Sequence, residues 1–194
     1  HSALLQFLRH FWTFLWQSQT MCFENHDTAS DEYENRYERK FGKNVCDAML
    51  VVTFTCGCVP FIYNGNEIAD SCRHSLWNNR FYGKNLCVDW SEALTKDGKN
   101  RTALVKSLIK IYHNISAINI GDIKVLTESA DFTAYKKTHG DREVLVIANM
   151  TKDIQTVSLN CENLSDYQTL LSARNIIDNN VVTLSDGGYL VLYK

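Results

Sequence analysis

Two short apolar segments, each ending in polar residues and separated by a helical segment, limit the folds open to this chain. Residues 20–24 predict a buried strand that gives way to residues 25–27. A helical pattern covers residues 45–55, and residues 59–63 predict a second strand, followed by polar residues 64–67. A crossover of this length permits parallel pairing. Both strands would then end at one edge of a sheet, where parallel α/β folds bind ligands.

After Gly121 the hydrophobic pattern changes from helical to alternating. Residues 101–118 predict the clearest helix of the chain, and several short strands with polar turns between them follow, which predicts an antiparallel sandwich. These strands are expected at residues 123–126, 132–136, 143–149, 154–159, 167–171, 181–184 and 189–193. We therefore expect two parts, residues 1–121 and residues 122–194. Because no low-complexity linker separates them, they should pack together.

Composition excludes several classes of protein. The hydrophobic fraction of 45% supplies ample core material, and a net charge of −2 gives no general attraction to nucleic acid or to anionic membranes. The apolar residues of the first 16 positions recur at helical spacing, but they fall short of the roughly 20 needed to cross a membrane and lack the layout of a signal peptide. We expect a core helix there, over residues 2–16.

The chain has seven cysteines, an odd number, so at least one is unpaired within the chain. Cys56-Gly57-Cys58 is too closely spaced for a usual zinc site, and no second pair accompanies it. Buried free thiols are the interpretation we favour. Free thiols favour a cytoplasmic location, while an extracellular or periplasmic one stays open.

Several segments together resemble the α-amylase family of glycoside hydrolases. Residues 23–27 (FENHD) and residues 60–67 (PFIYNGNE) resemble the last two barrel strands of that family. Residues 73–76, residues 89–91 and the helix from Arg101 continue the likeness, and the final part resembles the family's C-terminal domain. The resemblance implies the C-terminal part of a (β/α)8 TIM barrel over residues 1–121, followed by an antiparallel β-sandwich domain over residues 122–194.

The resemblance also implies roles for five residues. Retaining glycosidases use two carboxyl groups, and a third carboxylate in this family holds the distorted sugar ring. By resemblance Asp27 is that catalytic, transition-state-stabilising carboxylate, His26 donates a hydrogen bond to a hydroxyl of the same sugar, and Asn25 orients its neighbours. Glu67 and Gly65 would support the residues that contact the sugar, without contacting it themselves. Gly65 is also expected to adopt a φ that other residues avoid.

Each of these residues has a structural alternative. An Asp after a strand is often a turn former or a helix cap, and a single His is often a satisfied structural group. Arg73, His74 and Trp77 could contact sugar or could be ordinary surface residues. Tyr82 and Trp90 could stack on sugar rings or could belong to the core. Residues 31–40 carry many charges, which favours a solvated surface; a loop over a ligand site is the alternative.

No segment matches the family's nucleophile or its acid/base, which lie on earlier barrel strands. The chain, which begins with His and not Met, is therefore expected to be a fragment of a retaining glycoside hydrolase acting on α-linked glucans such as starch, maltodextrin or related oligosaccharides. Its partners would be the glucan and the missing N-terminal part of the barrel. No cofactor is expected in this chain, with calcium left to the intact parent. The alternative is a non-catalytic relative with a glucan-binding or structural role.

Overall fold

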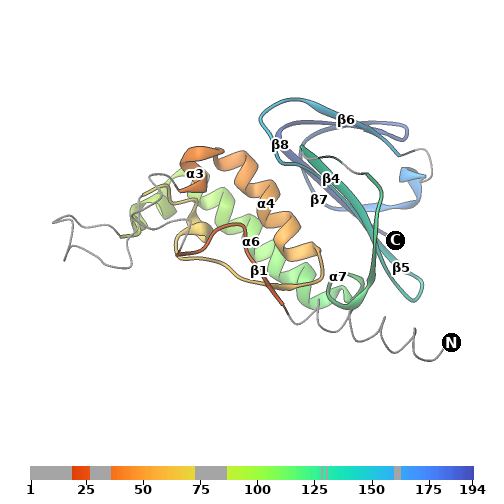
Figure 1. The fold of residues 1–194 in the computed structure, drawn as a ribbon, viewed down its shortest axis with the longest axis horizontal. Helices are drawn as coiled ribbons and strands as arrows, with labels where there is room; N and C mark the ends of the chain where they lie inside the picture. Colours follow the sequence, from red (N-terminus) through yellow and green to blue (C-terminus); the bar gives the residue numbers. More distant parts are fainter. Residues whose placement is uncertain (1–18, 27–35, 73–86, 128, 130, 160–162) are drawn as a thin grey trace.

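The computed structural model describes residues 19–26, 36–72, 87–127, 129, 131–159 and 163–194. The helix expected over residues 2–16 lies outside this described part. Figure 1 shows a helical layer on one side and a curved antiparallel sheet on the other. Within the described part, no helix is both long enough and apolar enough to cross a membrane.

The two strands that open the chain pair in parallel, as the sequence predicts. Strand β1 (Thr20–Met21) lies beside β2 (Val59–Pro60), with Thr20 opposite Val59 and Met21 opposite Pro60. Each is only two residues long, whereas the sequence predicted five. The segments that follow leave the ladder early, because their backbones turn to meet buried charged side chains described below.

Helices occupy the region between and after these strands. They are α3 (Tyr37–Lys40), α4 (Lys43–Thr55), α6 (Lys96–Asn114) and α7 (Ser116–Ile120), with 3-10 turns η1 (Asn66–Ile68) and η2 (Trp90–Leu94). The helix expected over residues 101–118 is thus two helices, and the first of them begins earlier, at Lys96. Thr95 explains the early start, because its side chain accepts a hydrogen bond from the backbone N–H of Gly98 at 3.0 Å.

Helix α4 begins without a side-chain cap. Gly42 occupies the N-cap position, and Asn44 lies inside the first turn of α4. The Nδ2 of Asn44 instead donates to Oδ2 of Asp186 at 2.8 Å, which ties the helix to the β-domain.

The C-terminal part is an antiparallel sheet with the strand order β3-β4-β5-β8-β6, and β7 also pairs with β8. Its strands are β3 (Asp122–Val125), β4 (Phe132–His139), β5 (Arg142–Asn149), β6 (Gln155–Ser158), β7 (Gln168–Asp178) and β8 (Val181–Tyr193), with the 3-10 turn η3 (Leu164–Asp166) before β7. The expected turn at residues 186–188 does not divide two strands, since β8 runs through it. β7 is also far longer than the expected 167–171.

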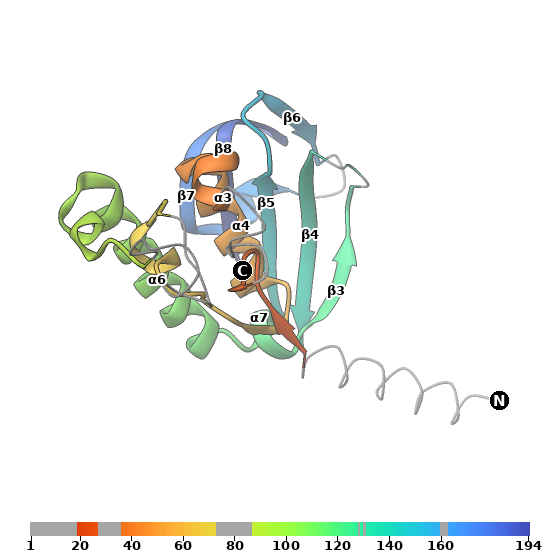
Figure 2. The ribbon, with the colours of Figure 1, turned by 60° about the vertical axis from the view of Figure 1, so that its left-hand side comes forward.

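Strand β8 explains why the sheet curls. One side of β8 pairs with β7 along its length, while the other side pairs with β6 near its start and with β5 near its end. Gly187, at φ +59°, lies so close to the backbone of Asn44 that a Cβ atom there would clash. Figure 2 shows the resulting curved sheet beside the helices. The expected α/β plus antiparallel β architecture is confirmed.

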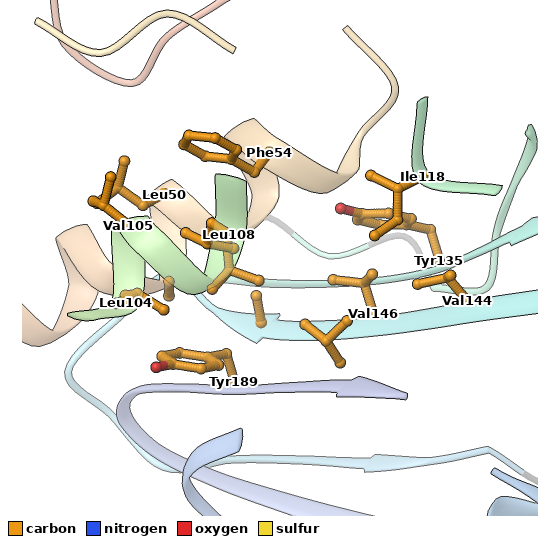
Figure 3. Packing of buried hydrophobic residues seen from close by; sticks show 14 of the residues in the cluster. Leu50, Phe54, Leu104, Val105, Leu108, Ile118, Tyr135, Val144, Val146 and Tyr189 are labelled. Atoms are coloured by element: carbon orange, nitrogen blue, oxygen red, sulfur yellow. The ribbon is translucent and has the colours of Figure 1, made fainter. Parts of the chain in front are cut away.

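Two hydrophobic clusters hold the chain together. The first joins α4, α6 and α7 to one face of the sheet and includes Leu50, Phe54, Leu108, Ile118, Tyr135, Val146 and Tyr189 (Figure 3). The second lies on the opposite face, within the curl, and includes Leu145, Ile147, Leu184 and Leu190. The helices and the antiparallel strands therefore share a core, as the absence of a linker led us to expect.

Candidate functional site

The ends of β1 and β2 lie side by side, and a buried carboxylate joins the segments that follow them. Glu24, which comes just after β1, is 1% exposed. Its Oε2 accepts hydrogen bonds from Nη2 of Arg36 and from Nδ2 of Asn66, both at 2.7 Å, while its Oε1 accepts from the backbone N–H of Tyr37 at 2.8 Å. One side chain thus fixes the chain after β1, the chain after β2 and the start of α3.

Arg36 extends this cluster to a second carboxylate. Its Nη1 donates to Oδ2 of Asp70 at 2.9 Å, and its Nη2 donates to the carbonyl of Asn64 at 3.1 Å. The guanidinium also lies over the ring of Tyr63, 5.6 Å from the ring centre. Arg36 and both carboxylate side chains are fully buried. Pairing with two carboxylates compensates the cost of burying the cation.

Gly65 adopts the unusual backbone conformation expected from the sequence, with φ +89°. A Cβ atom at this position would lie 2.9 Å from Cβ of Asp70 and 3.0 Å from Nη1 of Arg36. Glycine is required here for two reasons: the left-handed conformation, and the close approach of the Arg36–Asp70 pair.

A second buried cluster is joined to the first through Asn66. Arg101, on α6, donates from Nε to Oδ1 of Asp47 at 2.6 Å, from Nη1 to Glu38, and from Nη2 to the carbonyl of Lys43 at 2.8 Å. Its Nη1 also donates to the carbonyl of Asn66 at 3.0 Å. Burial raises the pKa of the Glu38 carboxyl above its ordinary value, and Arg101 opposes this shift.

Three expected site residues follow Glu24 directly. Asn25 is half-buried and His26 is exposed at the end of β1. Asp27, the expected transition-state carboxylate, lies outside the described residues. The structure therefore places Asn25 and His26 next to a rigidly held residue, and their roles stay predictions.

The backbone of Glu67 links the chain after β2 to α6. Its carbonyl accepts a hydrogen bond from Oγ1 of Thr102, on α6, at 3.0 Å, and its side chain is half-buried. Trp90, in η2, is 61% exposed and so is not a core residue. The remaining candidate sugar contacts, Arg73, His74, Trp77 and Tyr82, lie outside the described residues.

Sequence reasoning missed the charged residues that organise this region. We expected residues 31–40 to form a solvated surface, yet Arg36 and Glu38 are 1% and 4% exposed. Glu24 could have indicated a buried cation, because a carboxylate in an apolar strand requires a buried partner.

Two further features bear on ligand binding. A cavity of about 240 Å³ opens between α4, α6 and β7 and is lined in part by Lys43, Arg101 and Arg174. Neither Asn25 nor His26 nor Glu67 lines it. Among the described residues, no group of three or more His, Cys, Asp or Glu side chains could hold a metal ion.

Parallel strands with a crossover helix, joined to a curled antiparallel sheet, define the C-terminal part of an α-amylase-type fold. Solved structures of that family match this chain and confirm the resemblance at the level of fold. No family model matches the sequence. No curated protein matches it either.

Three solved structures illustrate the likeness. Trehalose-6-phosphate hydrolase of Bacillus licheniformis has a TM-score of 0.67 and 14% identity, over 88% of this chain and 42% of that chain. Trehalulose synthase of Pseudomonas mesoacidophila MX-45 has a TM-score of 0.67 and 15% identity, over 91% and 43%. Isomaltulose synthase of Klebsiella sp. LX3 has a TM-score of 0.63 and 14% identity, over 82% and 41%. This chain thus spans less than half the length of each.

Proposed function

We propose that this chain is the C-terminal part of a retaining glycoside hydrolase that acts on α-linked glucans such as starch, maltodextrin or related oligosaccharides. In this proposal Asp27 holds the flattened, positively charged sugar ring of the transition state. His26 donates a hydrogen bond to a hydroxyl of the same sugar. Asn25 orients these neighbours.

The observation that supports the proposal is the way Glu24 is held. Its carboxylate accepts hydrogen bonds from Arg36 and Tyr37 at the start of α3 and from Asn66 after β2, which are two segments far apart in the sequence. Since Glu24 directly precedes Asn25 and His26, the backbone that leads to these residues has little freedom. Catalytic groups need this kind of support, because small displacements of a reacting geometry cost large factors in rate.

A complete site requires groups that this chain does not supply. A retaining glycosidase needs a nucleophile and an acid/base, about 5 Å apart across the scissile bond. We propose that preceding barrel strands carry both groups. The exposed apolar side chains of β2 and its continuation, Val59 and Phe61, are each 43% exposed and fit a face that such strands would cover.

The test uses the longest natural polypeptide that contains this chain, with maltooligosaccharides as substrate. We expect wild type to hydrolyse them and Asp27→Asn to lose roughly 10³-fold in kcat, because interactions with the distorted sugar supply several kcal/mol. His26→Ala should lower kcat/KM by a smaller factor. Asp89→Asn is the matched control, because Asp89 is exposed and only caps η2.

Three results would decide against the proposal. An Asp27→Asn variant as active as Asp89→Asn would remove Asp27 from the chemistry. Absence of hydrolysis by the wild type would leave a binding or structural role, which retention on an amylose column would then distinguish. Turnover by the 194-residue chain alone would show that the two missing carboxyl groups are not needed.

A further inference from the structure

Two cysteines lie at a sharp turn of the chain, at the opposite end of β2 from the candidate site. Helix α4 ends at Thr55, and Cys56 still has helical backbone angles, with φ −74° and ψ −11°. Gly57 then takes φ +96°, and β2 begins directly after Cys58. The turn brings the side chains of Cys56 and Cys58 within hydrogen-bonding reach of each other.

The spacing of these cysteines suits a disulfide. Two Cα atoms that flank a single residue are at most about 7 Å apart, and a bend at that residue shortens the distance. Disulfides bridge Cα atoms roughly 4.4 to 6.8 Å apart. Gly57 supplies the bend and has no side chain of its own.

A buried lysine lies against the same turn. Lys137, on β4, is 1% exposed, and its Nζ donates to the carbonyl of Ile118, in the middle of α7. The Nζ is so close to Gly57 that a Cβ atom there would clash with it. The charge of Lys137 lowers the pKa of the Cys58 thiol, against the larger effect of burial and the contribution of Cys56. A cation beside a thiol stabilises the thiolate, which is the reactive form.

We propose that Cys56 and Cys58 form a reversible dithiol–disulfide pair, a thiol-modification site that responds to disulfide oxidants such as glutathione disulfide. The Cys58 thiolate attacks one sulfur of glutathione disulfide and releases the first glutathione as a thiolate, leaving a mixed disulfide. The Cys56 thiolate then attacks the Cys58 sulfur and releases the second glutathione. Two protons leave the protein and end on the two glutathione thiols.

Lys137 has a positioning role in this exchange. Its ammonium group stabilises the thiolate that attacks, and it remains bound to the carbonyl of Ile118 throughout. Burial nevertheless raises the pKa of the Cys58 thiol to about 11. Exchange should therefore be slow at neutral pH and accelerate between pH 7 and pH 9 as the thiolate fraction grows, by less than tenfold per pH unit, because the Lys137 amine loses its charge near pH 8.

Cys46 provides an internal comparison. It lies on α4, is completely buried, and its surroundings raise the pKa of its thiol through burial and the carboxylate of Glu38. The charged groups that act most on the Cys46 thiol are Glu38 and Arg101, whereas Cys56 acts on the Cys58 thiol. Cys46 should remain reduced under conditions that oxidise the pair.

The experiment incubates the 194-residue chain in glutathione buffers of increasing oxidised-to-reduced ratio, blocks the remaining thiols with acid and an alkylating reagent, and digests with chymotrypsin. Cleavage after Phe54 and Phe61 yields the peptide of residues 55–61, which contains only Cys56 and Cys58. We expect this peptide to escape alkylation and to become about 2 Da lighter as the ratio rises. Cys46 should be alkylated throughout.

Variants separate the proposed role of Lys137 from a general effect on folding. Lys137→Met should slow disulfide formation at pH 7, where the Lys137 amine is still charged, by roughly tenfold, because an adjacent charge is worth on the order of one pKa unit. Lys136→Met, which removes a neighbouring lysine on β4, should leave the rate unchanged. Equal rates in the two variants would remove Lys137 from the proposal.

The pair itself is refuted by a different result. In that result the peptide of residues 55–61 stays doubly alkylated in the native chain at every glutathione ratio and becomes oxidised only in urea. The fold would then prevent the bond. A disulfide between Cys58 and any cysteine other than Cys56 would refute the proposal equally.

Discussion

Replacing Lys137 with methionine should make the protein more stable at neutral pH, although it removes a buried hydrogen bond. Burial lowers the pKa of the Lys137 amine from 10.5 to about 8. The folded state therefore holds this proton less tightly than the unfolded state does. Below pH 8 the charged amine is a cost to folding, and the cost disappears as the pH rises from 8 to 10.5, because the unfolded state binds more protons in that window.

The size of the effect follows from the shift. The fall in the Lys137 pKa from 10.5 to about 8 corresponds to about 3 kcal/mol in free energy of unfolding. Loss of the hydrogen bond to the carbonyl of Ile118 removes about 1 kcal/mol. Lys137→Met should therefore gain about 2 kcal/mol in free energy of unfolding at pH 7, or roughly 4 to 8 °C in Tm for a chain of this size.

Urea unfolding of wild type and variant at several values of pH between 7 and 10.5 measures this prediction. The difference between the two proteins isolates Lys137, since thiols and tyrosines titrate in both. The advantage of the variant should be nearly constant below pH 8, fall to zero near pH 10, and turn into a deficit that approaches about 1 kcal/mol at higher pH, where only the lost hydrogen bond remains. Lys136→Met is the control, because Lys136 pairs with Glu143 at 3.5 Å near the surface and should contribute less than about 1 kcal/mol. A Lys137→Met variant that is less stable than wild type at pH 7, or an advantage independent of pH, would refute the reasoning.

Three further predictions concern the ends of the parallel strands. Arg36→Met should lower the free energy of unfolding by about 3 to 5 kcal/mol in urea titrations, because Glu24 and Asp70 would remain buried without their shared cation; a loss below 1 kcal/mol would contradict the network. Gly65→Ala should cost clearly more than Gly140→Ala, since Gly140 also has a positive φ, +63°, but open space around it; equal losses would show that crowding by Arg36 and Asp70 is unimportant. The 194-residue chain should self-associate in sedimentation velocity experiments, because apolar side chains beside β1 and β2 are exposed; a stable monomer with cooperative unfolding would contradict this.

The sequence predicted the elements well and their extents less well. The hydrophobic pattern and the spacing of the two segments were sufficient to predict the parallel pairing of β1 with β2. Strand formation depends on the local pattern, and parallel pairing depends on the length of the crossover. The second half of β7 was missed because residues 172–178 are mostly polar and half-exposed, so they do not alternate clearly. The turn expected at residues 186–188 has the composition of a loop, yet pairing with β7 on one side carries β8 through it.

The charged clusters could not be predicted from local pattern. Arg36 meets Asp70 at a separation of 34 residues, and Arg101 meets Glu38 at a separation of 63. Charge runs are usually solvated, and only the tertiary fold brings these partners together. Gly65 was anticipated because its backbone requirement is local, whereas its close contact with Arg36 became visible only in the structure.

Strand β5 places alternate side chains in different cores. Val144, Val146 and Ala148 pack toward the helices, while Leu145 and Ile147 pack into the curl of the sheet. The β-domain is therefore not an interchangeable module. Excising residues 122–194, or grafting them onto another barrel, would expose a continuous apolar stripe or require a matching helical surface. A recombined chain should be stable only when α4 and α6 come from the same parent as the sheet, which a single crossover at residue 121 cannot achieve.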